Sequence, residues 1–583
     1  MSIFYPSMPR IKVQTFTLLA IVICLLNAFY FMCSSAIPII QADAWYFLDV
    51  DVLKWANEGF HWDDLFVKRG LIDHAQPMNK FFLYLNYRLF NLDFRFESFL
   101  GFLGLVLITL FFIIKFFQHI RNNNSYFFSS LIFLMAIFTL SSLNATGLYS
   151  WTLVTFQFLP LFIAIVTAWY AWKMVLHNQL FLALPFSLIA FIIVGDTAAI
   201  ILWVSISIAI LLLNFRSDGL VLRRVIFWIC GSGIYVGIYF LILNFNFLSA
   251  DSTSASAKSL NLLDLNFYLE SIRIIFSSTL MQGLHLEVFG ENAKLVSWVV
   301  AVPVFYFYVM HFLQLLFISK PKNDIDFLIT FILTYATISI VAIIFGRVPE
   351  FGVDYLNQPR YVLVYQLIPF ALFLKWSFAT QPSEIFRRRL TTGAFVVFFA
   401  AFVMVQVIYS VKAHKSTRWI SQWVSNQVVA ISNYTNDPSI PSGNCTPHSK
   451  PICNLPVNKR NELLSLMINR QLNLFNPNFQ WRYRVFPSIK TENLNVIAWG
   501  PQILSPSLQS KGIWIKLFQP IQNEASIKIR LGEIAIKKMY FLGNVITFDI
   551  PDSVKNTRGE YDLRLSIDDW KNEKYIGKLN ITK

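Results

Sequence analysis

Three carboxylates follow closely on the first long apolar run of the chain. The run begins near Thr15, and residues 37–51 (IPIIQADAWYFLDVD) place Asp43, Asp49 and Asp51 just beyond its end. A carboxylate held at a membrane surface, in a partly dry setting, has a tunable pKa and can accept a proton from a reacting group. Aspartate is also a preferred helix-capping residue, and Asp43 stands directly before a helical pattern. The sequence therefore leaves two roles open for Asp43, a general base and a helix cap.

Two arginines form a second candidate group within residues 345–365 (FGRVPEFGVDYLNQPRYVLVY). Arg347 lies just outside one apolar run and Arg360 just before the next, so both side chains reach the same layer at the membrane surface. Guanidinium groups bind phosphate through paired hydrogen bonds, and the pair therefore predicts a phosphate clamp. The alternative is interfacial anchoring, which arginine and tyrosine provide at span ends without any ligand.

Residues 61–90 mix both signs of charge at the same membrane face and suit a polar ligand. The ionisable residues of this stretch include Asp63, Asp64, Lys68, Asp73, His74, Lys80 and Arg88. Adjacent Asp63 and Asp64 are typical of a solvated turn. No two histidines here have the i,i+4 spacing of a helical zinc site, so we assign no residues to a metal site. The histidines and carboxylates leave a divalent cation open as a cofactor.

The composition of the chain excludes a soluble globular protein. Of its 583 residues 56% are hydrophobic and 17% aromatic, while only 14% are charged, which predicts a polytopic membrane protein. Much of the formal net charge of +15 lies in short connections between apolar runs. There it is a topology signal, and we do not expect nucleic-acid binding. The first run is longer than a signal-peptide core and lacks a small-residue cleavage site, so we expect a retained anchor.

About 11 segments approach the roughly 20 apolar residues that cross a hydrocarbon core. The predicted spans are 15–37, 97–118, 126–143, 151–172, 179–194, 197–214, 225–247, 294–318, 325–346, 361–376 and 391–411. We split the run from 179 to 214 at Gly195-Asp196, because it is too long for one span and a charge is unfavourable in mid-bilayer.

One set of basic residues then falls on a single side of the membrane, which predicts a cytoplasmic amino terminus. The set comprises Arg10 and Lys12, Lys115 and Arg121, Lys173, Arg216 with Arg223 and Arg224, Lys320 and Lys322, and Lys375 with Arg387 to Arg389. The opposite, exported side receives the first loop (38–96), the 347–360 loop and the whole tail after residue 411. Between their ends the predicted spans carry almost no ionisable residues apart from His311 and the junctional Asp196. An ion-coupled transporter is therefore disfavoured, since it needs charges along its pathway.

The first loop begins with an amphipathic pattern. Trp45, Leu48, Val52 and Trp55 recur at helical spacing between charged residues. This predicts a helix that lies in the membrane interface with its apolar face on lipid.

The tail changes character at Lys412. A helical stretch leads into a polar, Pro-rich segment with Cys445 and Cys453, where a local disulfide fits an oxidising compartment and a pair of free thiols is the alternative. Apolar residues then alternate with polar ones in four runs between 513 and 567, which predicts half-buried strands of a β-sandwich or β-rich domain. We therefore expect a transmembrane domain over 1–411 and an exported domain over 412–583.

Taken together, these features resemble the GT-C superfamily of membrane glycosyltransferases. The resemblance rests on an acidic residue directly after the first span (Ala42-Asp43-Ala44-Trp45), a long first loop, about 11 spans, an arginine-bearing late loop and an exported C-terminal domain. More narrowly, DHAQPMNK before a span and GRVPEFGVDYLNQPRY later are similar to bacterial members whose substrates are mostly unassigned. The resemblance covers roughly residues 1–411 and does not include the tail.

The resemblance implies an inverting transfer of a sugar from a polyprenyl-phosphate-linked donor to an envelope glycan, lipid or protein. The reaction would take place on the exported, periplasmic face of the bacterial cytoplasmic membrane. Asp43 would be the general base, and Arg347 and Arg360, with Lys80, would stabilise the departing phosphate. Asp73 and His74 would position the sugar or the acceptor. The tandem acidic pair usual in the family is absent here, which makes Asp49 the rival base.

Two other functions fit the same residues. A polymerase or ligase of lipid-linked glycans would use the same phosphate leaving group, and only its products would distinguish it. A non-catalytic binder or transporter of lipid headgroups would need the arginine pair but neither Asp43 nor Asp49.

Overall fold

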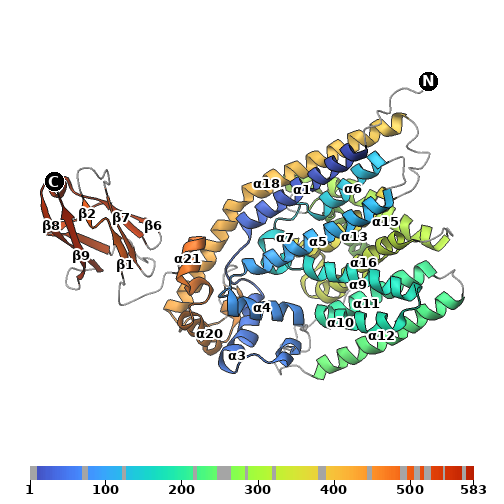
Figure 1. The fold of residues 1–583 in the computed structure, drawn as a ribbon, viewed down its shortest axis with the longest axis horizontal. Helices are drawn as coiled ribbons and strands as arrows, with labels where there is room; N and C mark the ends of the chain where they lie inside the picture. Colours follow the sequence, from blue (N-terminus) through green and yellow to red (C-terminus); the bar gives the residue numbers. More distant parts are fainter. Residues whose placement is uncertain are drawn as a thin grey trace. The chain divides into compact units, whose positions relative to one another are not determined.

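The computed structural model describes residues 10–68, 76–120, 126–214, 219–245, 264–282, 287–317, 323–378, 389–442, 445, 450–485, 487, 496–504, 512–517, 527–542, 545–567 and 573–582 (Figure 1). The chain forms two compact units. The helical unit comprises Met1–Ile37, Glu58–Leu85 and Phe94–Ile420, and the tail unit comprises Pro38–Asn57, Asn86–Asp93 and Ser421–Lys583. Two pieces of the first loop therefore fold with the tail, a grouping that the sequence did not predict.

A helix covers each of the predicted spans. The bounds are α1 Arg10–Ser35, α5 Arg95–Ile120, α6 Tyr126–Leu140, α9 Phe158–Leu176, α10 Leu180–Val194, α11 Asp196–Asn214, α12 Gly219–Phe245, α15 Ala293–Phe317, α16 Asp324–Phe351, α17 Val362–Ser377 and α18 Arg389–Asn436. Within the described ranges, eight helices are both long and apolar enough to cross a membrane. Helices α6 and α10 are also apolar but are shorter than these eight. The helical unit thus has the features of a polytopic membrane protein.

The chain breaks between α10 and α11 at Gly195, where the sequence predicted a break. Gly195 has φ 101°, in the left-handed region that glycine enters without a steric penalty. Helix α11 then packs against α10, α12 and α16. The apolar run from 179 to 214 is therefore two helices and not one.

Helix α18 is longer than the sequence predicted. It runs without a break for 48 residues, about 70 Å at 1.5 Å per residue, so the predicted span and the following helical stretch are one element. Near its middle α18 lies beside α1 (Figure 1): the Ser410 hydroxyl donates to Asn27 Oδ1 at 2.9 Å, and His414 Nε2 lies 3.1 Å from the same oxygen. Polar pairs of this kind hold apolar helices in register where water is absent.

Two glycines let α5 approach the chain at the start of α9 very closely. A Cβ atom at position 101 would lie 2.1 Å from the backbone oxygen of Thr155, and one at position 104 would lie 2.6 Å from the backbone nitrogen of Leu159. Small residues allow such backbone contact between helices in membranes. The segment held in this way includes α8 (Thr152–Thr155), which begins directly after Trp151.

Two β-sheets form the end of the tail. The strands are β1 Val496–Gly500, β2 Ile503–Leu504, β3 Gly512–Leu517, β4 Ile527–Leu531, β5 Ile534–Ala535, β6 Met539–Leu542, β7 Val545–Asp549, β8 Gly559–Ile567 and β9 Lys574–Ile581. One sheet has the strand order β1-β3-β7-β6 and the other β2-β9-β8-β4-β5.

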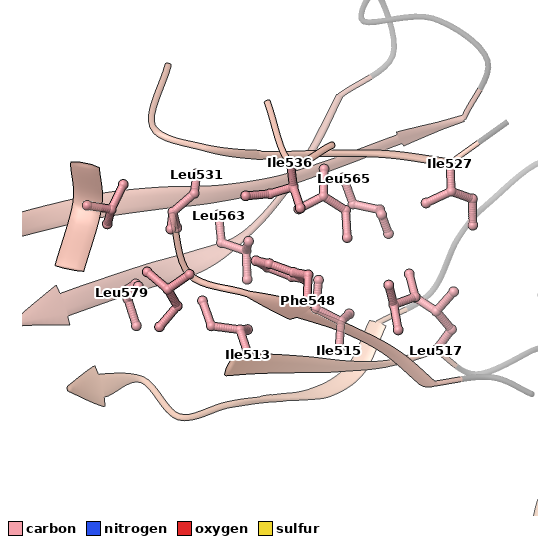
Figure 2. Packing of buried hydrophobic residues seen from close by; sticks show 14 of the residues in the cluster. Ile513, Ile515, Leu517, Ile527, Leu531, Ile536, Phe548, Leu563, Leu565 and Leu579 are labelled. Atoms are coloured by element: carbon pink, nitrogen blue, oxygen red, sulfur yellow. The ribbon is translucent and has the colours of Figure 1, made fainter. Parts of the chain in front are cut away.

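The alternating apolar residues predicted from the sequence fill the space between these sheets. Figure 2 shows Ile513, Ile515 and Phe548 facing Leu563 and Leu565 across the core, and all five are buried. A C-terminal β-rich region is thus confirmed, because the period of two in the sequence matches the pleat of a strand.

Cys445 and Cys453 are joined by a disulfide that closes a short loop before helix α20 (Val457–Asn469). Such a bond stabilises mainly by restricting the unfolded chain, and for a loop of this size we expect about 2–3 kcal/mol. Replacing both cysteines by serine should therefore lower the unfolding temperature of the tail, measured by scanning calorimetry. Dithiothreitol should lower the unfolding temperature of the parent equally and leave the double variant unchanged; a parent that does not respond to the reductant would contradict the prediction.

Candidate functional site

Arg360 lies in the connection between α16 and α17, among aromatic rings. The connection consists of the short helices η4 (Val353–Asn357) and η5 (Pro359–Tyr361). The guanidinium carbon lies 5.8 Å from the ring centre of Trp151 and 5.2 Å from those of Tyr355 and Tyr361, within the range of cation–π attraction. One terminal nitrogen donates to the Tyr355 hydroxyl. Nε is buried and has no hydrogen-bond partner among the described residues, so a donor of this cation is left for a ligand.

Arg347 lies in the last turns of α16 and is exposed. Burial raises the pKa of the Tyr361 phenol, while the charges of Arg360 and Arg347 both act to lower it. Both guanidinium groups are therefore within electrostatic reach of one hydroxyl. The prediction that the two arginines serve one ligand stays a prediction, and their common neighbour Tyr361 is consistent with it.

Buried amides hold this connection in place. Asn144 is fully buried, donates to the Ser278 carbonyl at 3.0 Å and accepts from the backbone N–H of Gln282 at 2.6 Å. The Gln282 side chain in turn donates to the Asn357 carbonyl at 3.2 Å. Neither Asn144 nor Gln282 could be predicted from the sequence, because their hydrogen-bond partners lie far away along the chain.

The exit of α1 lies at the same corner of the helical unit. The Ile37 N–H donates to the Ser150 carbonyl at 3.0 Å, and Arg95 Nε donates to the Ala36 carbonyl at 3.0 Å. Ser150 immediately precedes Trp151, the ring that lies beside Arg360. The end of the first span is therefore fixed next to the arginine-bearing connection.

Lys80 and Asp64 have structural partners within the helical unit. Lys80, on α4 (Pro77–Leu89), is buried, and its Nζ donates to the carbonyls of Asp64 at 3.2 Å and Val67 at 2.9 Å. The Asp64 carboxylate accepts from the His61 N–H at 3.0 Å and caps the short helix η2 (Trp62–Phe66). The solvated turn predicted from Asp63 and Asp64 is thus wrong for Asp64, which is buried, whereas Asp63 is exposed.

The remaining charges of this stretch are placed only in part. Lys68 is buried, with its Nζ 5.3 Å from the ring centre of Phe240 on α12. A role of Lys80 in phosphate binding stays a prediction. Asp73 and His74, predicted to position the substrate, lie outside the described residues.

Asp49 and Asp51 lie near the start of the first loop, in the tail unit, on one nearly continuous helix that begins directly after Asp43. It consists of α2 (Ala44–Phe47), the π-helical turn η1 (Leu48–Val52) and α3 (Leu53–Asn57), and we call it the acidic helix. The π turn carries both Asp49 and Asp51. Such turns are rare and are frequent at functional sites.

The carboxylates of Asp43, Asp49 and Asp51 differ in exposure. Asp43 occupies the N-cap position of α2 but is exposed, and its side chain makes no capping hydrogen bond. The Asp49 side chain is only 10% exposed, and one of its oxygens lies 3.7 Å from Lys459 Nζ. Asp51 is buried. Asp43 is therefore the carboxylate open to a ligand, and the structure does not support its alternative role as a helix cap.

Protein covers the apolar face of the acidic helix. Trp45, Leu48, Val52 and Trp55 are all buried. Helix α19 (Lys450–Asn454) packs against α2, and α20 packs against η1. The amphipathic pattern predicted lipid on this face, and that prediction is wrong because protein buries it. The helical period shows which face is apolar but not which surface buries it.

No group of three or more His, Cys, Asp or Glu side chains in the described part of the chain is placed to hold a metal ion. A divalent cation is therefore not assigned to any residue.

In comparisons with known proteins, no protein-family model, no curated protein and no solved structure matches this chain.

Proposed function

We propose that this protein is an inverting, GT-C-type glycosyltransferase that takes its sugar from a polyprenyl-phosphate carrier. The observation that carries the proposal is Arg360, at the end of a connection between apolar helices. Three aromatic rings lie around its guanidinium group, and its Nε is buried with no hydrogen-bond partner in the part of the chain that the structure describes. A lipid phosphate meets a protein at this depth, and a guanidinium group matches its geometry. In bacteria this face would be the periplasmic face of the cytoplasmic membrane, with the amino terminus in the cytoplasm.

In the proposed reaction Arg360 and Arg347 bind the phosphate that links the lipid to the sugar. The acceptor hydroxyl attacks the anomeric carbon from the face opposite the phosphate. The bond from that carbon to the phosphate oxygen breaks, and the new glycosidic bond has the inverted configuration. Asp43 accepts the proton of the acceptor hydroxyl, and the arginines stabilise the negative charge that grows on the departing lipid phosphate.

Native mass spectrometry of the purified protein with added undecaprenyl phosphate tests the phosphate site. The parent should retain the lipid, and both Arg360→Ala and Arg347→Ala should lose it, because an uncompensated phosphate is costly to hold at an apolar surface. Arg223→Ala is the matched control: Arg223 is an exposed arginine near the start of a different apolar helix, α12. A parent that takes up no lipid, or arginine variants that bind as the parent does, would overturn the proposal.

A further inference from the structure

The turn that follows α20 holds both ends of the first loop. Within the tail unit, the terminal nitrogens of Arg470 donate to the Ala56 carbonyl at 2.7 Å and to the Tyr87 hydroxyl at 2.6 Å. Asn473 Nδ2 donates to the carbonyls of Pro38, at 3.0 Å, and Leu92. One asparagine thus bridges the chain that enters the acidic helix and the chain that leaves α4.

Further polar contacts join this part of the tail to the end of the first loop. The backbone N–H of Asn473 donates to the Asn91 carbonyl at 2.7 Å. Asp93 accepts from the Tyr483 hydroxyl and pairs with Arg482 at 3.4 Å. Tail residues between 470 and 483 therefore contact the first loop near its start and near its end, and all of these contacts are polar and specific.

Unfavourable backbone conformations gather at the same place. Ala42, Asn91, Leu92, Gln471 and Asn473 all have positive φ, between 47° and 61°, although none is a glycine. Each such residue costs on the order of 1 kcal/mol or more and persists only where the surroundings enforce it. Ala42 immediately precedes Asp43.

Buried polar atoms without partners add to this cost. Asn473 and Asn86 are both fully buried. The side-chain oxygen of Asn473 and both amide atoms of Asn86 have no hydrogen-bond partner among the described residues. A region selected for stability alone would avoid such atoms, so strain and unpartnered polar groups together indicate a functional constraint on the path of the first loop.

From these contacts we infer that residues 470–473, which we call the loop clamp, hold the acidic helix, which begins directly after Asp43, in place. Pro38, whose carbonyl Asn473 binds, stands five positions before Asp43, and Ala56, which Arg470 binds, lies at the far end of the same helix. The tail then determines the path of the first loop within its own unit. The role of Asp43 rests on the proposed function, whereas the action of the clamp on the helix does not.

Hydrogen–deuterium exchange of the full-length protein in detergent tests the clamp. Asn473→Ala should speed exchange on the order of tenfold in peptides covering 38–57 and 86–93, because each lost hydrogen bond that held a buried group promotes local opening. Peptides from the α16–α17 connection should exchange as in the parent. Asn461→Ala is the matched control, since Asn461 lies on α20 and donates to the Pro438 carbonyl, outside the clamp; its first-loop peptides should not change.

A second variant keeps the test decisive if Asn473→Ala folds poorly. Arg470→Ala removes only the contacts to Ala56 and Tyr87, and should speed exchange at the end of the acidic helix more than at its start. Unchanged exchange in both variants, or a uniform rise over the whole tail, would overturn the inference. Asn473→Ala should still bind undecaprenyl phosphate if the parent does. If the parent binds none, the proposed function fails, and the exchange data still decide the clamp.

Discussion

Asp43→Asn should reduce sugar transfer by a factor of about 10²–10⁴, the usual loss when a general base is removed. The variant should unfold at the same temperature as the parent, because Asp43 is exposed and its side chain caps nothing. The measurement is incorporation of radiolabelled sugar from endogenous lipid-linked donors into envelope material, in membrane vesicles that contain the parent or the variant.

Two further variants make this assay specific. Asp63→Asn is the control, since Asp63 is also an exposed aspartate of the first loop. It should transfer sugar as the parent does. Asp49→Asn tests Asp49 as the alternative general base, and it also breaks the ion pair with Lys459. If only this variant loses sugar transfer, the general base is Asp49 and not Asp43. If neither Asp43 nor Asp49 matters while Arg347 and Arg360 still bind lipid, the protein is a headgroup binder or transporter and not an enzyme.

Gly101→Ala should destabilise the helical unit by roughly 3 kcal/mol, the upper part of the range for overpacking a filled interior. A methyl group at this position would lie 2.1 Å from the Thr155 carbonyl oxygen, which is backbone and cannot rotate away. The measurement is thermal unfolding of the protein in detergent. Gly237→Ala is the control, because a Cβ at 237 on α12 meets no atom within 4 Å.

The same substitution should act on the arginine site. The carbonyl that clashes belongs to α8, which follows Trp151, and Trp151 lies beside Arg360. Gly101→Ala should therefore also weaken binding of undecaprenyl phosphate, whereas Gly237→Ala should not. An unfolding temperature equal to that of the parent would show that α5 can move away from α8 without loss.

The positions of the helices could be predicted because each is a local property of the sequence. A run of apolar residues long enough for a membrane is visible without its neighbours, and so is the glycine that separates α10 from α11. The strands of the tail were equally visible, since alternation at every second residue marks one buried face. The sequence did not show that the predicted span and the helical stretch after it form one helix, α18, because the polar residues that follow residue 411 end the apolar run but not the helix.

The candidate site could be predicted only in part. The positions of Arg347 and Arg360 at the ends of spans singled them out. The rings around Arg360, however, come from Tyr361 in η5, from Tyr355 in η4 and from Trp151, about two hundred residues earlier in the chain. The contacts of Asn473 with Pro38 and Leu92 join segments far apart in sequence. Contacts of this kind leave no local pattern, so reasoning from periodicity and composition does not reach them.

The burial of the acidic helix has a consequence for the order in which the protein is made. Trp45 and Leu48 leave the ribosome early, whereas α19 and α20, which cover their face, follow roughly 400 residues later. At about 5–20 residues per second that interval lasts about 20–80 s. During that interval the two helices that pack against the acidic helix in the finished protein have not yet been made. The acidic helix therefore reaches its buried state only after the carboxyl-terminal part of the chain has been synthesised.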